Sequence, residues 1–131
     1  GYTKEEMKMV WETKKILGDE NVLVNPTAVR VPVFFGHGEA LHIETGSPIS
    51  AEEVKDLLEQ ADGVVVCRDD ADFPTQIGDA SGKDATFVGR IREDISHNSG
   101  INMWIVADNV RKGAATNSVQ IAELLVKDYL S

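Results

Sequence analysis

The segment from Val29 to Gly38 places the strongest constraint on how this chain can fold. Its apolar residues are β-branched or aromatic, which is typical of a buried strand, and the run ends in a histidine enclosed by two glycines. The sequence therefore predicts a strand over residues 29–35 that leads into a turn at His37. Residues 40–45 alternate between apolar and polar side chains, so we expect them to form the returning strand of an antiparallel hairpin.

Arg30 and His37 are the two residues of this segment that packing alone does not explain. A guanidinium inside a strand is costly unless it meets an anion, and it can hold a carboxylate through two parallel hydrogen bonds. An imidazole between two glycines lies where a ligand can approach closely, and histidine titrates in the range that suits proton transfer at neutral pH. The residue types alone leave an alternative open, namely an edge-strand arginine in a salt bridge and a histidine exposed in a turn.

The size and charge of the chain limit the classes of protein to which it can belong. Its 131 residues suffice for one ordinary domain, and a net charge of −9 argues against a nucleic-acid partner, because phosphate binding needs a basic surface. No apolar stretch or charged leader predicts a membrane span or a secretion signal. The single cysteine, Cys67, fits a reducing compartment, so we expect a cytoplasmic protein. Its valine-rich surroundings indicate a packing residue rather than a nucleophile.

The first helix is predicted by a capping box, because Thr3 and Glu6 have the Ser/Thr-x-x-Glu spacing and Gly18 can end the helix. Glu12 and Lys15 project from one face of this helix, together with a lysine one turn earlier. From the sequence alone, a solvated face of salt bridges is the simpler interpretation of that row.

The rest of the chain predicts an α+β fold, with an antiparallel or mixed sheet flanked by helices. Residues 69–85 are the longest irregular stretch, which is typical of a functional loop or an interface arm, and their aspartates lack the spacing of an EF-hand. Neither a Gly-x-Gly-x-x-Gly sequence nor a phosphate-binding loop occurs, so no nucleotide-binding half and no metal site are predicted. The further elements expected are helices over residues 51–60 and 114–129 and strands over residues 63–67, 86–92 and 100–107.

Five separated segments carry a resemblance to a known family: Lys4–Leu17, Val29–His37, Asp72–Thr75, Ile95–Ile101 and Ala107–Asn117. In this order they resemble segments of bacterial aspartate-β-semialdehyde dehydrogenase. The resemblance covers essentially the whole chain but only the C-terminal part of the family's polypeptide, so it implies one C-terminal catalytic and dimerisation domain over residues 1–131. It also implies a fold like the catalytic domain of glyceraldehyde-3-phosphate dehydrogenase, a homodimer interface on the sheet, and a terminal helix over about residues 110–131 that packs on a coenzyme domain.

The reaction that this resemblance implies is the reduction of L-4-aspartyl phosphate to L-aspartate 4-semialdehyde by NADPH, with release of phosphate. It belongs to the biosynthesis of diaminopimelate and lysine, threonine and methionine. In the family a cysteine thiolate attacks the acyl phosphate, and the resulting thioester accepts hydride. That cysteine and the coenzyme domain are expected upstream of Gly1, so we expect the 131 residues to be inactive by themselves.

The resemblance also implies roles for individual residues at matching positions. Arg30 corresponds to the arginine that holds the α-carboxylate of the substrate, and His37 corresponds to the general acid/base. Glu12 corresponds to the glutamate that faces the substrate amino group, and Lys15 to the lysine associated with phosphate. Asn109 corresponds to a polar residue near the nicotinamide of NADP.

Two alternatives to this assignment remain open from the sequence. One is a non-catalytic module of the same family, retained for dimerisation alone. The other is a related acyl-phosphate reductase that acts on a different acid, which Glu12 and Arg30 together disfavour because they suit an amino-acid substrate.

Overall fold

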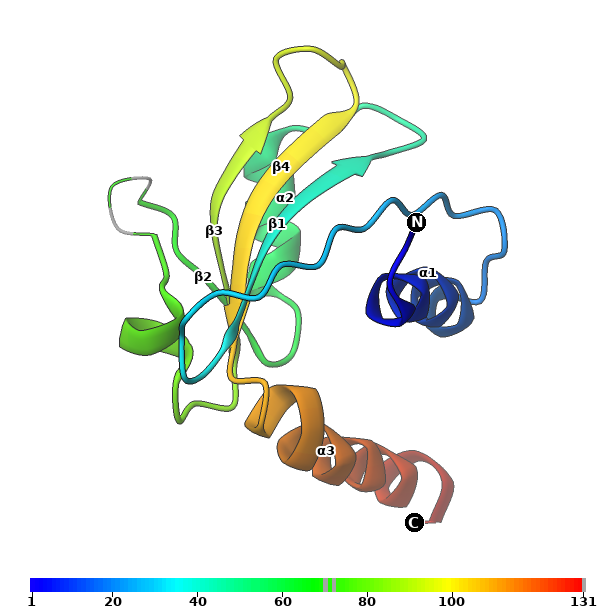
Figure 1. Ribbon diagram of the computed structural model, residues 1–131, viewed down its shortest axis with the longest axis vertical. Coiled ribbons are helices and arrows are strands. Elements are labelled where there is room, and N and C mark those ends of the chain that lie inside the picture. Colours follow the sequence, from blue (N-terminus) through cyan, green and yellow to red (C-terminus); the bar gives the residue numbers. More distant parts are fainter. Residues whose placement is uncertain (70, 72, 131) are drawn as a thin grey trace. The chain divides into compact units, whose positions relative to one another are not determined.

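The computed structural model describes residues 1–69, 71 and 73–130. They form two compact units, Gly1–Val33 and the chain from Phe34 onward (Figure 1). Two aspartates of the predicted irregular stretch, Asp70 and Asp72, lie outside the described residues, as does Ser131.

The first unit contains helix α1 (Lys4–Leu17), which begins and ends where the sequence predicts. Thr3 and Glu6 form the complete capping box, and Gly18 ends the helix in the left-handed conformation with φ +66°. The Glu6 carboxylate also accepts a hydrogen bond from the backbone N–H of Ala28 at 3.0 Å. Backbone hydrogen bonds from Thr3 and Ala28 lower the pKa of Glu6, and they tie the chain that follows α1 to the beginning of the helix.

The strand predicted over residues 29–35 is wrong. These residues are irregular, and the backbone N–H of Val33 donates to the carbonyl of Val31 at 2.8 Å, a tight turn that an extended strand does not contain. Val29 is 74% exposed and Phe34 is 93% exposed. A β-branched run becomes a strand only when a neighbouring strand accepts its hydrogen bonds, and no such neighbour pairs with this run in the part of the chain that the structure describes.

The second unit contains a four-stranded sheet built from β1 (His37–Glu44), β2 (Val64–Val66), β3 (Thr86–Glu93) and β4 (Gly100–Ala107). The order is β1-β4-β3-β2, with β2 parallel to β3 and the other pairs antiparallel (Figure 1). The predicted α+β fold with a mixed sheet is therefore confirmed. The predicted hairpin is wrong, because β1 begins at the histidine expected at its tip and pairs with β4, which lies far along the chain.

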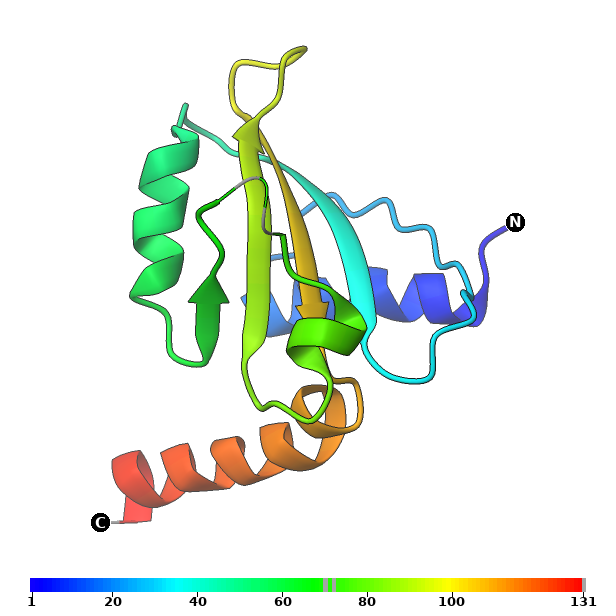
Figure 2. The same ribbon diagram turned by 90° about the vertical axis from the view of Figure 1, so that its left-hand side faces the viewer.

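Helix α2 (Ala51–Glu59) covers one face of the sheet and begins with the capping box predicted at Ser50 (Figure 2). Its apolar side chains pack against the main cluster of buried residues, which come from β3 and β4. On the other face, the short helix η1 (Gln76–Ala80) lies within the predicted irregular stretch and buries Ala80. The cluster under α2 contains Val88, Ile91, Ile101 and Met103.

The chain ends in a run of helical turns, η2 (Arg111–Ala115), α3 (Thr116–Leu125) and η3 (Val126–Leu130), which extends from the end of β4 (Figures 1 and 2). The terminal helix is thus confirmed, with its first turn slightly earlier than predicted. Asp108 anchors that turn, because its buried carboxylate accepts backbone hydrogen bonds from three residues, which are Gly82, Val110 and Arg111. No helix among the described residues is both long and apolar enough to cross a membrane.

His42 lies in β1 and pairs with Asp94, which follows β3, at 2.7 Å between Nε2 and Oδ2. Hydrogen bonds from the Ser96 side chain and backbone, followed in size by the contact with His42, lower the pKa of Asp94 from 3.8 to about 2. A carboxylate with a lowered folded-state pKa stabilises the fold above its unfolded pKa, and this contribution is lost as the pH falls through the folded value.

We therefore expect Asp94→Asn to be less stable than the parent above about pH 4, with a difference that shrinks as the pH approaches about 2. Urea denaturation followed between pH 2 and 6 measures this difference. Asp62→Asn is the matched control, because Asp62 is exposed and has no ion pair with any described residue. A difference between Asp94→Asn and the parent that stays constant over this range would contradict the assignment.

Candidate functional site

Glu12 and Lys15 lie one turn apart on α1, and both side chains are exposed. Neither forms an ion pair with a described residue, whereas Lys8 turns toward Glu5 at 3.8 Å. The row of salt bridges expected from the helical spacing of Glu12 and Lys15 is therefore not formed. A carboxylate and an ammonium side by side, each without a protein partner in the described chain, can bind a cation and an anion of one ligand.

Arg30 is exposed in the irregular segment of the first unit. It makes no hydrogen bond or ion pair with any residue that the structure describes, so the edge-strand salt bridge considered from the sequence is not formed. Arg30 is also not buried in a strand, because the segment around it is irregular. What remains is a guanidinium whose N–H donors are available for a carboxylate from outside the described chain.

His37 and Asn109 belong to the second unit, and the structure brings them to the same end of the sheet. His37 is the first residue of β1, where it pairs in register with Ala107 of β4, and Asn109 follows two residues later. The Asn109 Oδ1 accepts a hydrogen bond from the backbone N–H of Gly36 at 2.9 Å. Asn109 thus holds the residue immediately before His37, whose own side chain is exposed.

Two residues near His37 were missed by sequence reasoning, Gln76 and Trp104. Gln76 begins η1 inside the stretch predicted to be irregular, and Trp104 lies in the middle of β4, where it reads as a packing residue. Both lie against Gly38. The only sequence signal for this contact was the pair of glycines around His37, since glycine often marks a close approach of other atoms to the backbone.

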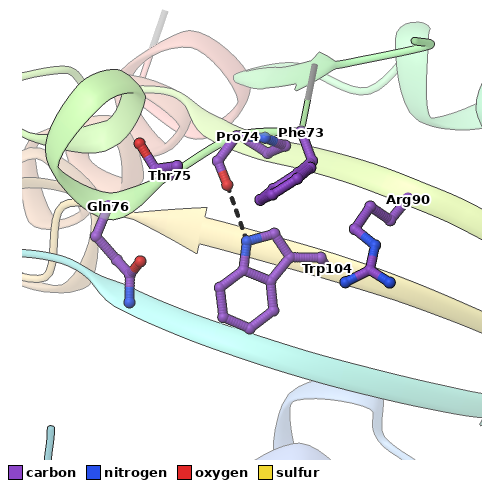
Figure 3. Close-up of a pocket in the computed structure, with 6 residues that line it drawn as sticks. All are labelled: Phe73, Pro74, Thr75, Gln76, Arg90 and Trp104. Atoms are coloured by element: carbon purple, nitrogen blue, oxygen red, sulfur yellow. Dashed lines mark hydrogen bonds between the residues drawn. The ribbon is translucent and has the colours of Figure 1, made fainter. Parts of the chain in front are cut away.

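A cavity of about 220 Å³ lies beside Gln76 and Trp104, on the face of the sheet opposite helix α2 (Figure 3). The Trp104 Nε1–H donates to the carbonyl of Pro74 at 2.9 Å, which orients the indole ring. Within residues 1–69, 71 and 73–130, no group of three or more His, Cys, Asp or Glu side chains is placed to hold a metal ion. The cavity is lined by Phe73, Pro74, Thr75, Gln76, Arg90 and Trp104.

Comparison with known proteins connects these residues to one family. Residues 1–112 match the family described as semialdehyde dehydrogenase, dimerisation domain. Aspartate-semialdehyde dehydrogenase 2 of Vibrio cholerae is 70% identical over 129 residues, which are 98% of this chain and 38% of that protein. The enzyme named aspartate-semialdehyde dehydrogenase in Aquifex aeolicus is 54% identical over 132 residues, again 38% of its length.

Solved structures agree with the sequence matches. The crystal structure of aspartate semialdehyde dehydrogenase II from Vibrio cholerae, complexed with ASA, has a TM-score of 0.95 at 70% identity and is matched over 38% of its chain. A probable aspartate-semialdehyde dehydrogenase from Pseudomonas aeruginosa has a TM-score of 0.90 at 37% identity, with the same shares of both chains covered. The chain spans little more than a third of the length of these relatives, and it belongs to the semialdehyde dehydrogenase dimerisation-domain family.

Proposed function

We propose that this chain is the C-terminal catalytic and dimerisation part of an aspartate-semialdehyde dehydrogenase. The complete enzyme would reduce L-4-aspartyl phosphate to L-aspartate 4-semialdehyde with NADPH and release phosphate. The observation that carries this proposal is the 70% identity to the Vibrio cholerae enzyme over 98% of the chain. The nucleophilic cysteine would lie outside these residues, since Cys67 is half-buried directly after β2 and does not match the family's motif.

Substrate binding would fall to the first unit. The exposed guanidinium of Arg30 can hold the α-carboxylate through a bidentate pair of hydrogen bonds, which a lysine cannot reproduce. Glu12 can accept hydrogen bonds from the α-ammonium group, and Lys15, one turn along α1, can neutralise the phosphate. This charge pattern fits a substrate that carries a carboxylate, an ammonium group and a phosphate.

Proton transfer would fall to His37 at the beginning of β1. A neutral imidazole nitrogen of His37 can accept the proton of the attacking thiol, which leaves the thiolate as the nucleophile. After phosphate has left and hydride has been added to the thioester carbon, the imidazolium can return its proton to the sulfur as the C–S bond breaks and the aldehyde forms. Both steps require the imidazole to be held in place relative to the reacting carbon.

NADPH would supply the hydride, and one residue of this chain fits its nicotinamide ring. Asn109 is half-buried, and its Oδ1 is occupied by the backbone N–H of Gly36. Its Nδ2 donates to no residue that the structure describes, so an N–H donor remains available for the carboxamide oxygen of a nicotinamide. Asn109 would orient the ring beside the segment that carries His37.

The exposed helix at the end of the chain would pack on the coenzyme domain of the same polypeptide. Val119, Leu124 and Val126 are each more than half exposed, and an apolar helix face of this kind is usually covered. The family description as a dimerisation domain supports a homodimer. The complete enzyme is therefore proposed to be a homodimer in which each coenzyme domain covers this terminal helix.

Two measurements test the proposed function. The first is the intact mass of the natural gene product, together with its reading frame, and we expect a coenzyme domain and a cysteine-bearing motif before residue 1. The second is NADP reduction by that protein with L-aspartate 4-semialdehyde and phosphate, followed at 340 nm, with the 131-residue chain as the inactive control. A natural product of 131 residues that only dimerises would support the non-catalytic module instead.

A further inference from the structure

We propose that Gln76 is a positioning residue for His37. Its side chain lies across both glycines that flank the histidine and holds the backbone from which the imidazole projects. The inference rests on the role of His37 in the proposed function. It assigns a functional role to one residue of the long stretch at residues 69–85.

The contacts at the two glycines carry the proposal. A Cβ added to Gly36 would lie 2.8 Å from Gln76 Cβ and 3.1 Å from Gln76 Cγ. A Cβ added to Gly38 would lie 2.5 Å from Gln76 Nε2 and 2.7 Å from Trp104 Cη2. The Gln76 side chain therefore runs from one glycine to the other, with its stem on Gly36 and its carboxamide on Gly38. Gly36 also has φ +91°, a conformation that favours glycine.

Gln76 acts on His37 through the backbone and not through the imidazole. Side chains alternate along a strand, so Gly38 and Gln76 lie on the face of β1 that carries Trp104, and the His37 side chain points to the opposite face. In Figure 3, the Gln76 carboxamide and the six-membered ring of Trp104 both extend toward β1. With Asn109 bound to the N–H of Gly36, the backbone around His37 is held from several directions.

The segment that carries Gln76 is itself fixed to the sheet. Pro74 is fully buried, and a Cβ on Gly89 would lie 2.5 Å from its Cδ, so Gly89 makes room for the proline ring. The carbonyl of Pro74 accepts the hydrogen bond from Trp104 Nε1 (Figure 3). The hydroxyl of Thr75 then caps η1 by accepting from the backbone N–H of Gly78 at 3.0 Å.

This arrangement matters for catalysis because proton transfer depends on sub-ångström placement of the imidazole. A shift of about 1 Å in a catalytic group can reduce the rate about 100-fold even when the group itself is intact. Replacing Gln76 by alanine keeps only the Cβ and leaves Gly38 without the carboxamide. The segment that carries His37 then gains freedom to move, although every residue proposed to bind substrate or coenzyme is unchanged.

The test uses Gln76→Ala in the complete enzyme, with kcat and KM for L-aspartate 4-semialdehyde measured separately. We expect kcat to fall about 10- to 100-fold while KM stays within about threefold and the melting temperature is unchanged. Gln76→Met should restore most of kcat, because the methionine side chain is long enough to reach both glycines, and Gln76→Asn should not. Ile77→Ala is the matched control in the same helical turn, since Ile77 is 70% exposed and supplies none of the three atoms nearest to a Cβ added at either glycine.

Hydrogen–deuterium exchange of the peptide over residues 34–40, in the same protein, gives a readout independent of turnover. We expect about tenfold faster exchange in Gln76→Ala than in the parent, confined to this peptide. If Gln76→Ala does not fold, the comparison of Gln76→Asn with Gln76→Met replaces it. Unchanged exchange together with unchanged kcat would overturn the positioning role. An inactive parent enzyme would instead overturn the proposed function and leave the exchange result to decide on Gln76.

Discussion

His37→Ala in the complete enzyme is expected to lower kcat by about 10²- to 10⁴-fold while KM for L-aspartate 4-semialdehyde changes by only a few-fold. The physical reason is that the substitution removes the imidazole, the one side chain in residues 29–38 that can accept and return a proton near neutral pH. The residues proposed to bind the substrate lie on the first unit and are unchanged. Steady-state kinetics of NADP reduction at 340 nm measures both constants.

The chain supplies its own control for this experiment. His97 is exposed in the turn between β3 and β4, where its Nδ1 accepts a 3.3 Å hydrogen bond from the backbone of Ser99. His97→Ala makes the same chemical change at a position with no proposed role, so kcat should stay within about twofold. Near-normal kcat of His37→Ala would show that His37 is not the general acid/base, independently of the kinetics of the Gln76 variants.

Arg30→Lys is expected to raise KM about 10- to 100-fold with a smaller effect on kcat. Lysine keeps the positive charge but loses the planar pair of N–H donors that matches a carboxylate. Because Arg30 is exposed and makes no hydrogen bond or ion pair with a described residue, the substitution should leave the melting temperature unchanged. Kinetics and thermal unfolding of the same preparation separate these effects.

A second substrate sharpens this prediction. 3-Aminopropanal has the aldehyde and the amino group of L-aspartate 4-semialdehyde but lacks the α-carboxylate. The parent enzyme and Arg30→Lys should therefore use it equally poorly, since the interaction lost in the variant is absent from this substrate. Arg92→Lys, a conservative change at an exposed position in β3, is the matched control. A KM effect of equal size with both substrates would show that Arg30 does not read the carboxylate.

The parts of the fold that the sequence predicted correctly are those that depend on neighbours in the chain. The capping boxes at Thr3 and Ser50 form as their spacing indicates, because the groups that satisfy each helix end lie three residues apart. The apolar runs of β3 and β4 likewise form strands where the sequence predicts them, and they bury residues on both faces of the sheet. Local geometry is enough to decide these features.

The error at residues 29–35 has a different origin. Valine and phenylalanine favour a strand only where a neighbouring strand takes their hydrogen bonds, and that neighbour is a property of the whole fold. β4 pairs with residues 37–44 instead, so the preceding apolar run stays irregular and exposed. The hairpin was expected from sequence proximity, whereas the sheet joined segments about 60 residues apart.

The sequence by itself determined the family, the beginnings of the two capped helices α1 and α2, and the residue types of the candidate site, since motifs and caps are written in adjacent residues. Only the tertiary structure decided that Asn109 binds the backbone beside His37 and that Gln76 lies across its two glycines. These contacts join residues tens of positions apart, and no local pattern encodes them. The first contact forms because the sheet pairs β1 with β4. The second forms because Pro74 packs on Gly89, which places Gln76 at the same end of the sheet.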